Sequence, residues 1–255
     1  MELFDTHSHY NDDAFNDDLD IVLKKVYDAK VTKLVCIGYN LESSKKAIEI
    51  ANKYNFIYAT CGISPNDVNE NSINELEEIY ELAKNNKKVV AIGEIGLDYY
   101  WNKENKDLQK SVFIKQIELA NKLDLPITIH TRDAHIDTIQ ILTENKCNNN
   151  GIFHCCPLNV ELIKEGIALG YYISFTGVVT FKNAKPELPI KEVPLNRLLI
   201  ETDCPYMAPE PYRGKRNDSS YVVEVARKLA TEKNITLEQM AEITYKNALD
   251  VYKIK

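Results

Sequence analysis

Residues 33–62 read KLVCIGYNLESSKKAIEIANKYNFIYATCG, and this stretch contains the unit from which the fold follows. Two short apolar runs, KLVCIG at 33–38 and FIYATCG at 56–62, have the composition of β-strands. Between them, SSKKAIEIANKY at 43–54 repeats its apolar residues with the spacing of a helix that buries one face. Strands that alternate with helices in this way predict a parallel sheet.

The same alternation continues along the chain. Six further apolar runs resemble strands, at residues 2–7, 89–94, 126–131, 151–155, 171–177 and 197–202. Helical periodicity recurs at residues 19–30, 72–85, 107–123, 159–170 and 236–253. Ser43, Ser72 and Asp107 stand near helix starts and are candidate caps.

Eight such units without an intervening linker predict one α/β domain that covers residues 1–255. Chains of about 250 residues commonly form a single (β/α)8 TIM barrel, and the unbroken repetition favours this closed barrel over a doubly wound sheet. The seventh connection, at residues 182–194, looks short and irregular. The helix at 236–253 is expected to pack outside the barrel.

The composition excludes several classes of protein. A net charge of −7, from 31 basic and 38 acidic residues, argues against a broad basic face for duplex DNA, so contact with a polyanion needs a local basic cluster or metal ions. No apolar run approaches the roughly 20 residues of a membrane span, and the start, MELFDTHSHY, lacks a signal-peptide pattern. We therefore expect a cytoplasmic protein that does not act at a membrane. The six cysteines form no CxxC pair, which predicts buried, reduced thiols.

Scarce polar residues mark the ends of the predicted strands. The first strand ends in DTHSH at residues 5–9, where alternate side chains share one face. Taken alone, this motif is more typical of a polar turn with exposed histidines. However, four of the five histidines and two carboxylates stand at such strand ends, and these candidate ligands are His7, His9, Glu94, His130, His154 and Asp203.

The C-terminal strand ends of a TIM barrel converge on one mouth. Because buried imidazoles and carboxylates are costly unless they are paired or metal-bound, the six residues predict a metal site. His135, early in the helix after the fifth strand, falls outside the pattern and is expected to be a surface or packing residue.

Six ligands are too many for one tetrahedral ion and suit two ions that share a carboxylate. Glu94, central among the strands, is the natural bridge. A set of nitrogen and oxygen ligands without cysteine fits Zn²⁺, Mn²⁺ or Mg²⁺. Asp203 suits a ligand that also accepts the proton of an attacking water, which makes it the candidate catalytic residue.

Five motifs in order, DTHSH, GEIGLD, IHTRDA, FHC and IETDCPY with the following YRGKRN, resemble the TatD family of metal-dependent deoxyribonucleases over nearly the whole chain. The resemblance implies a TIM barrel of the metal-dependent hydrolase superfamily, two divalent cations and phosphodiester hydrolysis in DNA. It implies that one ion is held by His7, His9, Glu94 and Asp203, and the other by Glu94, His130 and His154.

Two segments depart from the family pattern. The family usually has GxHP after the third strand, where this chain has Gly62-Ile63-Ser64-Pro65. After His154 the family usually has CFSG, where this chain has Cys155-Cys156-Pro157-Leu158. Both segments are expected at the substrate mouth, so they bear on preference and rate more than on the class of reaction.

Further residues are candidates for substrate contact. Arg132 follows His130 by two positions and could grip a phosphate, or instead pair with Asp133 or Asp137. The densest basic cluster near a ligand, on the loop after Asp203, could bind phosphates or be a solvated turn; it comprises Arg213, Lys215 and Arg216.

Residues beside the ligands can support them or contact bases. Asp5 and Glu201 each precede a ligand by two positions and are expected to orient an imidazole or a water on the metal. The aromatic residues at 99–101 could stack on bases or form a packed lip of the barrel.

These features favour a metal-dependent hydrolase that cleaves DNA, as a 3′–5′ exonuclease on single-stranded or frayed ends. Ligand sets do not name substrates. A hydrolase of a small amide, lactone or phosphate ester, and a D-aminoacyl-tRNA deacylase-like enzyme, stay open as alternatives. So does a non-catalytic binding module, although the full ligand set argues against it. The oligomeric state is open.

Overall fold

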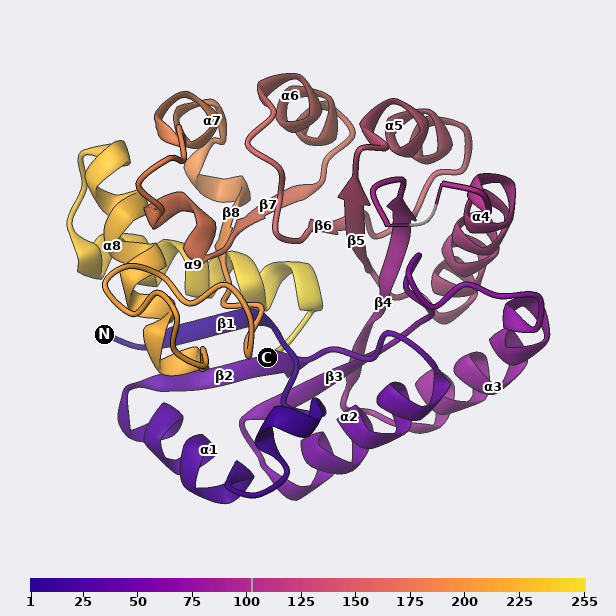
Figure 1. The fold of residues 1–255 in the computed structure, drawn as a ribbon, viewed down its shortest axis with the longest axis horizontal. Coiled ribbons are helices and arrows are strands. Elements are labelled where there is room, and N and C mark those ends of the chain that lie inside the picture. Colours follow the sequence, from indigo (N-terminus) through magenta and orange to yellow (C-terminus); the bar gives the residue numbers. More distant parts are fainter. Residues whose placement is uncertain (102) are drawn as a thin grey trace.

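Eight parallel strands follow one another around the molecule in sequence order, and helices on the outside connect them (Figure 1). The computed structural model describes residues 1–101 and 103–255. The strands are β1 (Leu3–Ser8), β2 (Val31–Cys36), β3 (Ile57–Cys61), β4 (Val89–Asp98), β5 (Ile127–Arg132), β6 (Gly151–Phe153), β7 (Tyr172–Phe175) and β8 (Leu198–Ile200). The TIM barrel predicted from the sequence is confirmed.

The helices are α1 (Leu19–Asp28), α2 (Leu41–Lys53), α3 (Ser72–Asn85), α4 (Lys106–Leu123), α5 (His135–Glu144), α6 (Val160–Ala168), α7 (Glu187–Glu192), α8 (Val222–Lys233) and α9 (Leu237–Tyr252). The seventh connection is irregular, as expected, because α7 has only 6 residues and lies between two 3-10 turns. It is not short, however, since it runs from residue 176 to residue 197. No helix in the described part of the chain has the length and apolar character needed to cross a membrane.

The three residues predicted as caps lie just inside their helices and not at the N-cap position, although Ser43 takes part in the capping of α2. Asn40 caps α2, and its side-chain oxygen accepts the Ser43 N–H at 2.9 Å in a reciprocal capping box. Ser72 and Asp107 lie inside the first turns of α3 and α4. Short polar residues occur on both sides of a helix start, so composition alone did not separate the cap from the first turn.

The barrel closes where the chain after β8 returns to β1. Ser8 and Cys204 form a parallel bridge. The Asp203 N–H donates to the His7 carbonyl at 2.9 Å, and the His9 N–H donates to the Cys204 carbonyl at 2.8 Å. Closure therefore brings the residues after β8 directly beside the end of β1.

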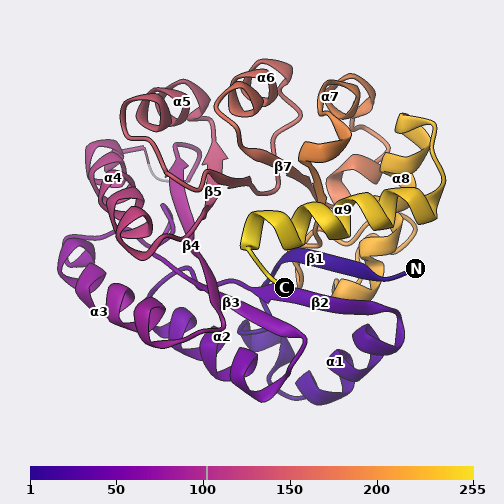
Figure 2. The same cartoon turned by 180° about the vertical axis from the view of Figure 1, so that it is seen from behind.

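The last helix, α9, seals the end of the barrel opposite these residues (Figure 2). Residues from β1, β2, β4, β6 and β8 form one buried cluster with Ala248, Val251 and Tyr252. Strands from opposite sides of a barrel share a cluster only through its interior. The Tyr252 hydroxyl donates to the Thr6 carbonyl at 2.9 Å. The expectation that this helix packs outside the barrel was wrong, because its apolar face covers the open interior end.

A glycine allows β4 and β5 to approach each other. Gly96 lies opposite His130 in the β4–β5 register and has a φ of +137°. A Cβ at Gly96 would lie 2.0 Å from the His130 carbonyl oxygen. Gly214 also has a positive φ, of +82°, but nothing lies within 4 Å of its Cβ direction.

We expect Gly96→Ala to lower the free energy of unfolding by about 3 kcal/mol or more, because strain and a backbone clash combine. Gly214→Ala is the matched control and should cost about 1–2 kcal/mol from the positive φ alone. Urea denaturation of the two variants beside the parent measures the difference. Equal losses in both variants would contradict the close-approach explanation.

Candidate metal centre

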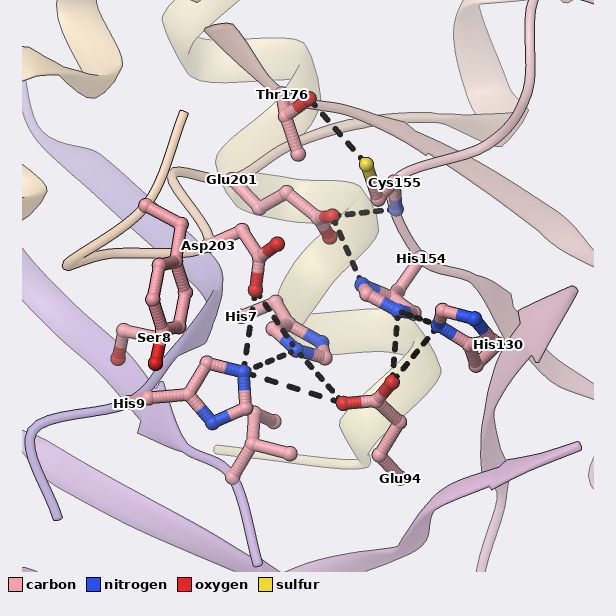
Figure 3. Close-up of polar contacts among 12 residues, drawn as sticks. His7, Ser8, His9, Glu94, His130, His154, Cys155, Thr176, Glu201 and Asp203 are labelled. Carbon is pink, nitrogen blue, oxygen red and sulfur yellow. Dashed lines mark hydrogen bonds and ion pairs between the residues drawn. The ribbon is translucent and has the colours of Figure 1, made fainter. Parts of the chain in front are cut away.

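The six candidate ligands converge at the C-terminal mouth of the barrel, around Glu94 (Figure 3). Each Glu94 oxygen faces a different pair of imidazoles. Oε2 lies 3.5 Å from Nε2 of His7 and 3.9 Å from Nε2 of His9. Oε1 lies 2.9 Å from Nδ1 of His130 and 3.2 Å from Nε2 of His154. This is the arrangement expected of a bridging carboxylate.

Asp203 completes the group of side chains around Oε2 of Glu94. Its Oδ1 lies 3.1 Å from Nε2 of His9 and 3.5 Å from Nε2 of His7. The two Nε2 atoms are themselves 3.1 Å apart. Ligands of a tetrahedral ion with bonds of about 2.0–2.1 Å lie about 3.3–3.4 Å apart, which is close to the separations of 3.1–3.5 Å among these three atoms.

A second group of side chains surrounds Oε1 of Glu94. Nδ1 of His130 and Nε2 of His154 are 3.2 Å apart, and both face the same Glu94 oxygen. The ligand atoms lie within 4.8 Å of one another in three overlapping trios, which are His7, His9 and Glu94; His7, His154 and Asp203; and Glu94, His130 and His154. Such donor sets suit divalent cations, so the residues fit the metal centre that the sequence predicts.

The electrostatics keep the carboxylates ionised. Burial works to raise the pKa of Glu94, but His154, His130 and His7 hold it well below the usual range. Burial also works against the charge of Asp203, and His9 and His7 lower the pKa of that carboxyl. Both carboxylates are therefore available as ligands at neutral pH.

The four imidazoles differ in their environment. Burial and the neighbouring His154 lower the pKa of His7. Burial opposes charge on His154 as well, but Glu94 and Glu201 raise its pKa well above the ordinary value. The rings of His7 and His154 stack with centroids 3.8 Å apart. Two stacked imidazoles at this distance favour at least one neutral ring, which is the form that binds a cation.

Asp98 is a site residue that the sequence reasoning missed. Its Oδ2 lies 3.0 Å from Nε2 of His130, which leaves Nδ1 of that ring facing Glu94. Glu94 was expected to end its strand, but β4 continues to Asp98. Glu94 and Asp98 are four residues apart on one strand, so period-two alternation from Glu94 in the GEIGLD motif would have found it.

The two predicted supporting carboxylates act differently from each other. Oε1 of Glu201 accepts the Cys155 N–H at 2.5 Å and lies 3.4 Å from Nδ1 of His154, so it does face an imidazole. Asp5 instead accepts the N–H of His7 at 3.2 Å and the hydroxyls of Thr202 and Ser219, both at 2.5 Å. It holds the backbone at the barrel seam, and burial raises its pKa to about 7.

A cavity of about 460 Å³ opens above the ligands. Its walls include five of the six predicted ligands, all but His7, together with Arg132 and part of the chain after β8. The lining residues are His9, Glu94, His130, Thr131, Arg132, His154, Cys155, Pro157, Asp203, Tyr206 and Met207. Of the two segments that depart from the family pattern, only the one after His154 lines this cavity. Ser64 is buried and donates to Asp67 at 2.9 Å.

The candidate phosphate contacts lie in different places. Arg132 is on the cavity wall, and its Cζ lies 3.8 Å from the centroid of the Tyr100 ring. No ion pair joins Arg132 to Asp133 or Asp137 among residues 1–101 and 103–255. Asp137 pairs with Lys110 at 2.7 Å. His135, at the start of α5, belongs to none of the ligand groups found in the described chain.

The basic loop lies outside the cavity lining. Arg216 pairs with Asp18 at 2.6 Å, and the Cζ of Arg213 lies 3.8 Å from the Phe181 ring centroid. Lys215 stands over the Tyr212 ring at 5.6 Å. All three side chains are exposed. Their role in binding substrate stays a prediction.

Comparison with known proteins agrees with a metal centre. The family model for TatD related DNase matches residues 4–253. The chain is 45% identical over 254 residues to the uncharacterized metal-dependent hydrolase YabD of Bacillus subtilis (strain 168), and the match covers 99% of both proteins. It is 30% identical over 262 residues to deoxyribonuclease TATDN3 of Homo sapiens, with 98% of this chain and 94% of the human protein covered.

Solved structures agree on the fold. The TatD homolog YJJV from Escherichia coli k12 is 26% identical, with a TM-score of 0.92 and coverage of 99% of this chain and 98% of that chain. The organophosphorus hydrolase from Deinococcus radiodurans is 13% identical, with a TM-score of 0.68 and coverage of 98% and 92%, and it shares the fold.

Proposed function

This chain belongs to the TatD family of metal-dependent hydrolases, and from that premise we propose that it hydrolyses phosphodiester bonds of DNA with two divalent cations. The observation that carries the proposal is the shared Glu94 carboxylate, which offers one oxygen to each of two ligand groups. Two adjacent divalent ions are the recurring arrangement in enzymes that displace an oxygen at phosphorus.

His7, His9, Glu94 and Asp203 would hold one ion, and Glu94, His130 and His154 the other. Zn²⁺, Mn²⁺ and Mg²⁺ are all compatible with this set of nitrogen and oxygen ligands. When bound, the cations supply Lewis acidity, which lowers the pKa of a water and stabilises charge on the phosphoryl oxygens.

Asp203 is the group that we assign to proton transfer. One of its oxygens faces the imidazoles of His7 and His9, and it lines the cavity beside them. Its carboxyl stays ionised because its pKa is lowered despite burial, chiefly by its contact with His9. An ionised carboxylate next to the attacked phosphorus can accept the proton of the attacking water.

Arg132 is the group that we assign to the substrate phosphate. Its guanidinium is on the cavity wall, and in the described part of the chain it forms no ion pair. Guanidinium N–H groups bind phosphate oxygens in a bidentate manner. The loop of Arg213, Lys215 and Arg216 would bind phosphates farther along the strand.

DNA is the proposed substrate because the family model and the human relative carry that activity in their names. A cavity of about 460 Å³ has the size of a pocket for a single small ligand. A strand end or unpaired segment fits such a cavity better than paired helix does. We therefore propose that the enzyme is an exonuclease on single-stranded or frayed DNA and that it digests strands in the 3′–5′ direction. Digestion of strands labelled at one end or the other would test the direction.

We expect Mn²⁺ titration calorimetry to give about two ions per chain, since Glu94 serves both ligand groups. His130→Ala and His154→Ala should each reduce the number to one. His135→Ala is the matched control and should keep both. A single ion that survives the loss of both His130 and His154 would contradict the two-ion proposal.

Asp203→Asn should reduce turnover by about 10²–10⁴-fold, the usual contribution of a general base. The amide oxygen can still face the imidazoles, so Mn²⁺ binding should weaken only in part. Steady-state cleavage of a labelled oligonucleotide, with metal content measured on the same sample, checks this. Near-parental turnover in a variant that keeps its metal would remove Asp203 from the proton-transfer role.

Cleavage of single-stranded DNA should weaken with added salt. In a plot of the logarithm of the binding constant against the logarithm of the salt concentration, each contacted phosphate contributes about −0.7 to the slope. Replacing Arg213, Lys215 and Arg216 by alanine should raise KM and flatten that slope. A small chromogenic phosphodiester should respond little, since it needs the centre and not the loop. The charge-matched control removes the exposed Lys24, Lys53 and Lys84 on outer helices.

If the variant without Arg213, Lys215 and Arg216 kept the parental salt dependence, the loop would not contact DNA phosphates. Efficient hydrolysis of small esters or amides, with no DNA cleavage under any of the three metals, would replace the nuclease by the small-substrate hydrolase.

A further inference from the structure

The aromatic residues after β4 divide into one buried anchor and two exposed rings. Tyr99 is buried; its hydroxyl donates to Asp137 at 2.6 Å, and Nζ of Lys106 lies 4.3 Å from its ring centroid. Tyr100 and Trp101 are 48% and 68% exposed. Two adjacent exposed rings form an apolar patch, and contiguous patches mark binding sites more often than singly exposed apolar side chains do.

One carboxylate fixes these rings relative to the metal centre. Oδ1 of Asp98 accepts the N–H of Tyr100 at 2.9 Å and the N–H of Trp101 at 3.1 Å. Its other oxygen, Oδ2, lies 3.0 Å from Nε2 of His130. Asp98 is fully buried, so it sets the position of both the imidazole and the aromatic turn.

Arg132 connects the two rings with the cavity. Asp98 and Arg132 are partners in the β4–β5 register, and the Arg132 side chain lines the cavity. Its Cζ lies 3.8 Å from the Tyr100 centroid and 5.6 Å from the Trp101 ring. The two rings meet edge to face, with centroids 4.8 Å apart.

Stacking of this kind leaves Arg132 able to bind a phosphate. A guanidinium that packs its face on a ring keeps its N–H donors in the plane, where they point outward. No hydrogen bond or ion pair occupies these donors within residues 1–101 and 103–255. The aromatic pair and the free donors therefore offer stacking and phosphate binding side by side.

We propose that Tyr100 and Trp101, together with Arg132, form a subsite that stacks one nucleobase next to the phosphate held in the cavity. The inference rests on the proposed nuclease function and names the part of the strand that is recognised. Every base has a π-face, so such a subsite accepts any sequence. A base can reach it only when it is unpaired, which selects single strands and frayed ends.

Trp101 is the only tryptophan of the chain, so its fluorescence reports directly on this subsite. The probe is a short oligothymidylate added to the Mg²⁺-loaded Asp203→Asn protein, in which cleavage is slow. We expect stacking to quench the emission. An abasic oligomer with the same number of phosphates should bind more weakly and leave the emission unchanged. Equal quenching by both oligomers, or none by either, would overturn the subsite.

A second measurement uses the otherwise unaltered enzyme. Replacing both Tyr100 and Trp101 by alanine should raise KM for the oligothymidylate by about 5- to 100-fold, the range for loss of one stacked base. kcat and the KM for the abasic oligomer should change little. Tyr100→Phe with Trp101→Phe should restore most of the affinity, because the rings are kept. Tyr27→Ala, which removes an exposed ring on α1, is the matched control.

The outcomes separate this inference from the proposed function. DNA cleavage with an unchanged KM in the double alanine variant would overturn the base subsite and leave the nuclease intact. Absence of cleavage in the parent protein would overturn the nuclease, and the inference with it.

Discussion

The centre of this protein depends on one buried carboxylate, that of Glu94. Its two oxygens face two different pairs of imidazoles, at 2.9–3.9 Å. A buried carboxylate without partners would be destabilising by several kcal/mol, so the surrounding strands must deliver their imidazoles to it. This requirement explains why β5 must approach β4 closely at Gly96, the position opposite His130. It also explains why Asp98 restrains that ring from its other side.

Closure of the barrel and the position of Asp203 in the centre depend on the same contacts. The strand that begins the chain meets the segment after β8 through backbone hydrogen bonds between Asp203 and His7 and between His9 and Cys204. Asp5 strengthens the same seam, because it accepts hydrogen bonds from Thr202 and from Ser219, far along the chain. A change that opens this seam separates Asp203 from the imidazoles, so stability and chemistry share the same contacts.

Local patterns in the sequence were sufficient for the strand order and for the six converging ligands. Apolar runs mark strands, and scarce polar residues at their ends are costly to bury without a partner. Contacts between distant segments were not predictable in this way. The pairing of Arg216 with Asp18 joins residues 198 positions apart, and nothing local in either segment indicates it. The place of α9 was missed for a related reason, because an amphipathic pattern shows that one face is buried but not against what.

The acidic character of the chain bears on how it meets a polyanion. With a net charge of −7, the overall field of the protein does not attract DNA. Within the cavity, Glu94 and Asp203 are ionised and would repel a phosphate, whereas Arg132 is the only arginine or lysine among the described lining residues. Divalent cations held by the imidazoles and carboxylates would reverse the local sign, since bound ions are often the largest charges in a site. Affinity for a phosphodiester would then depend on whether the metal ions are bound. Because salt screens charges, the bound ions would attract the phosphate only at short range. The exposed rings beside Arg132 contribute in a way that charge cannot, because stacking does not depend on the sign of the surrounding field.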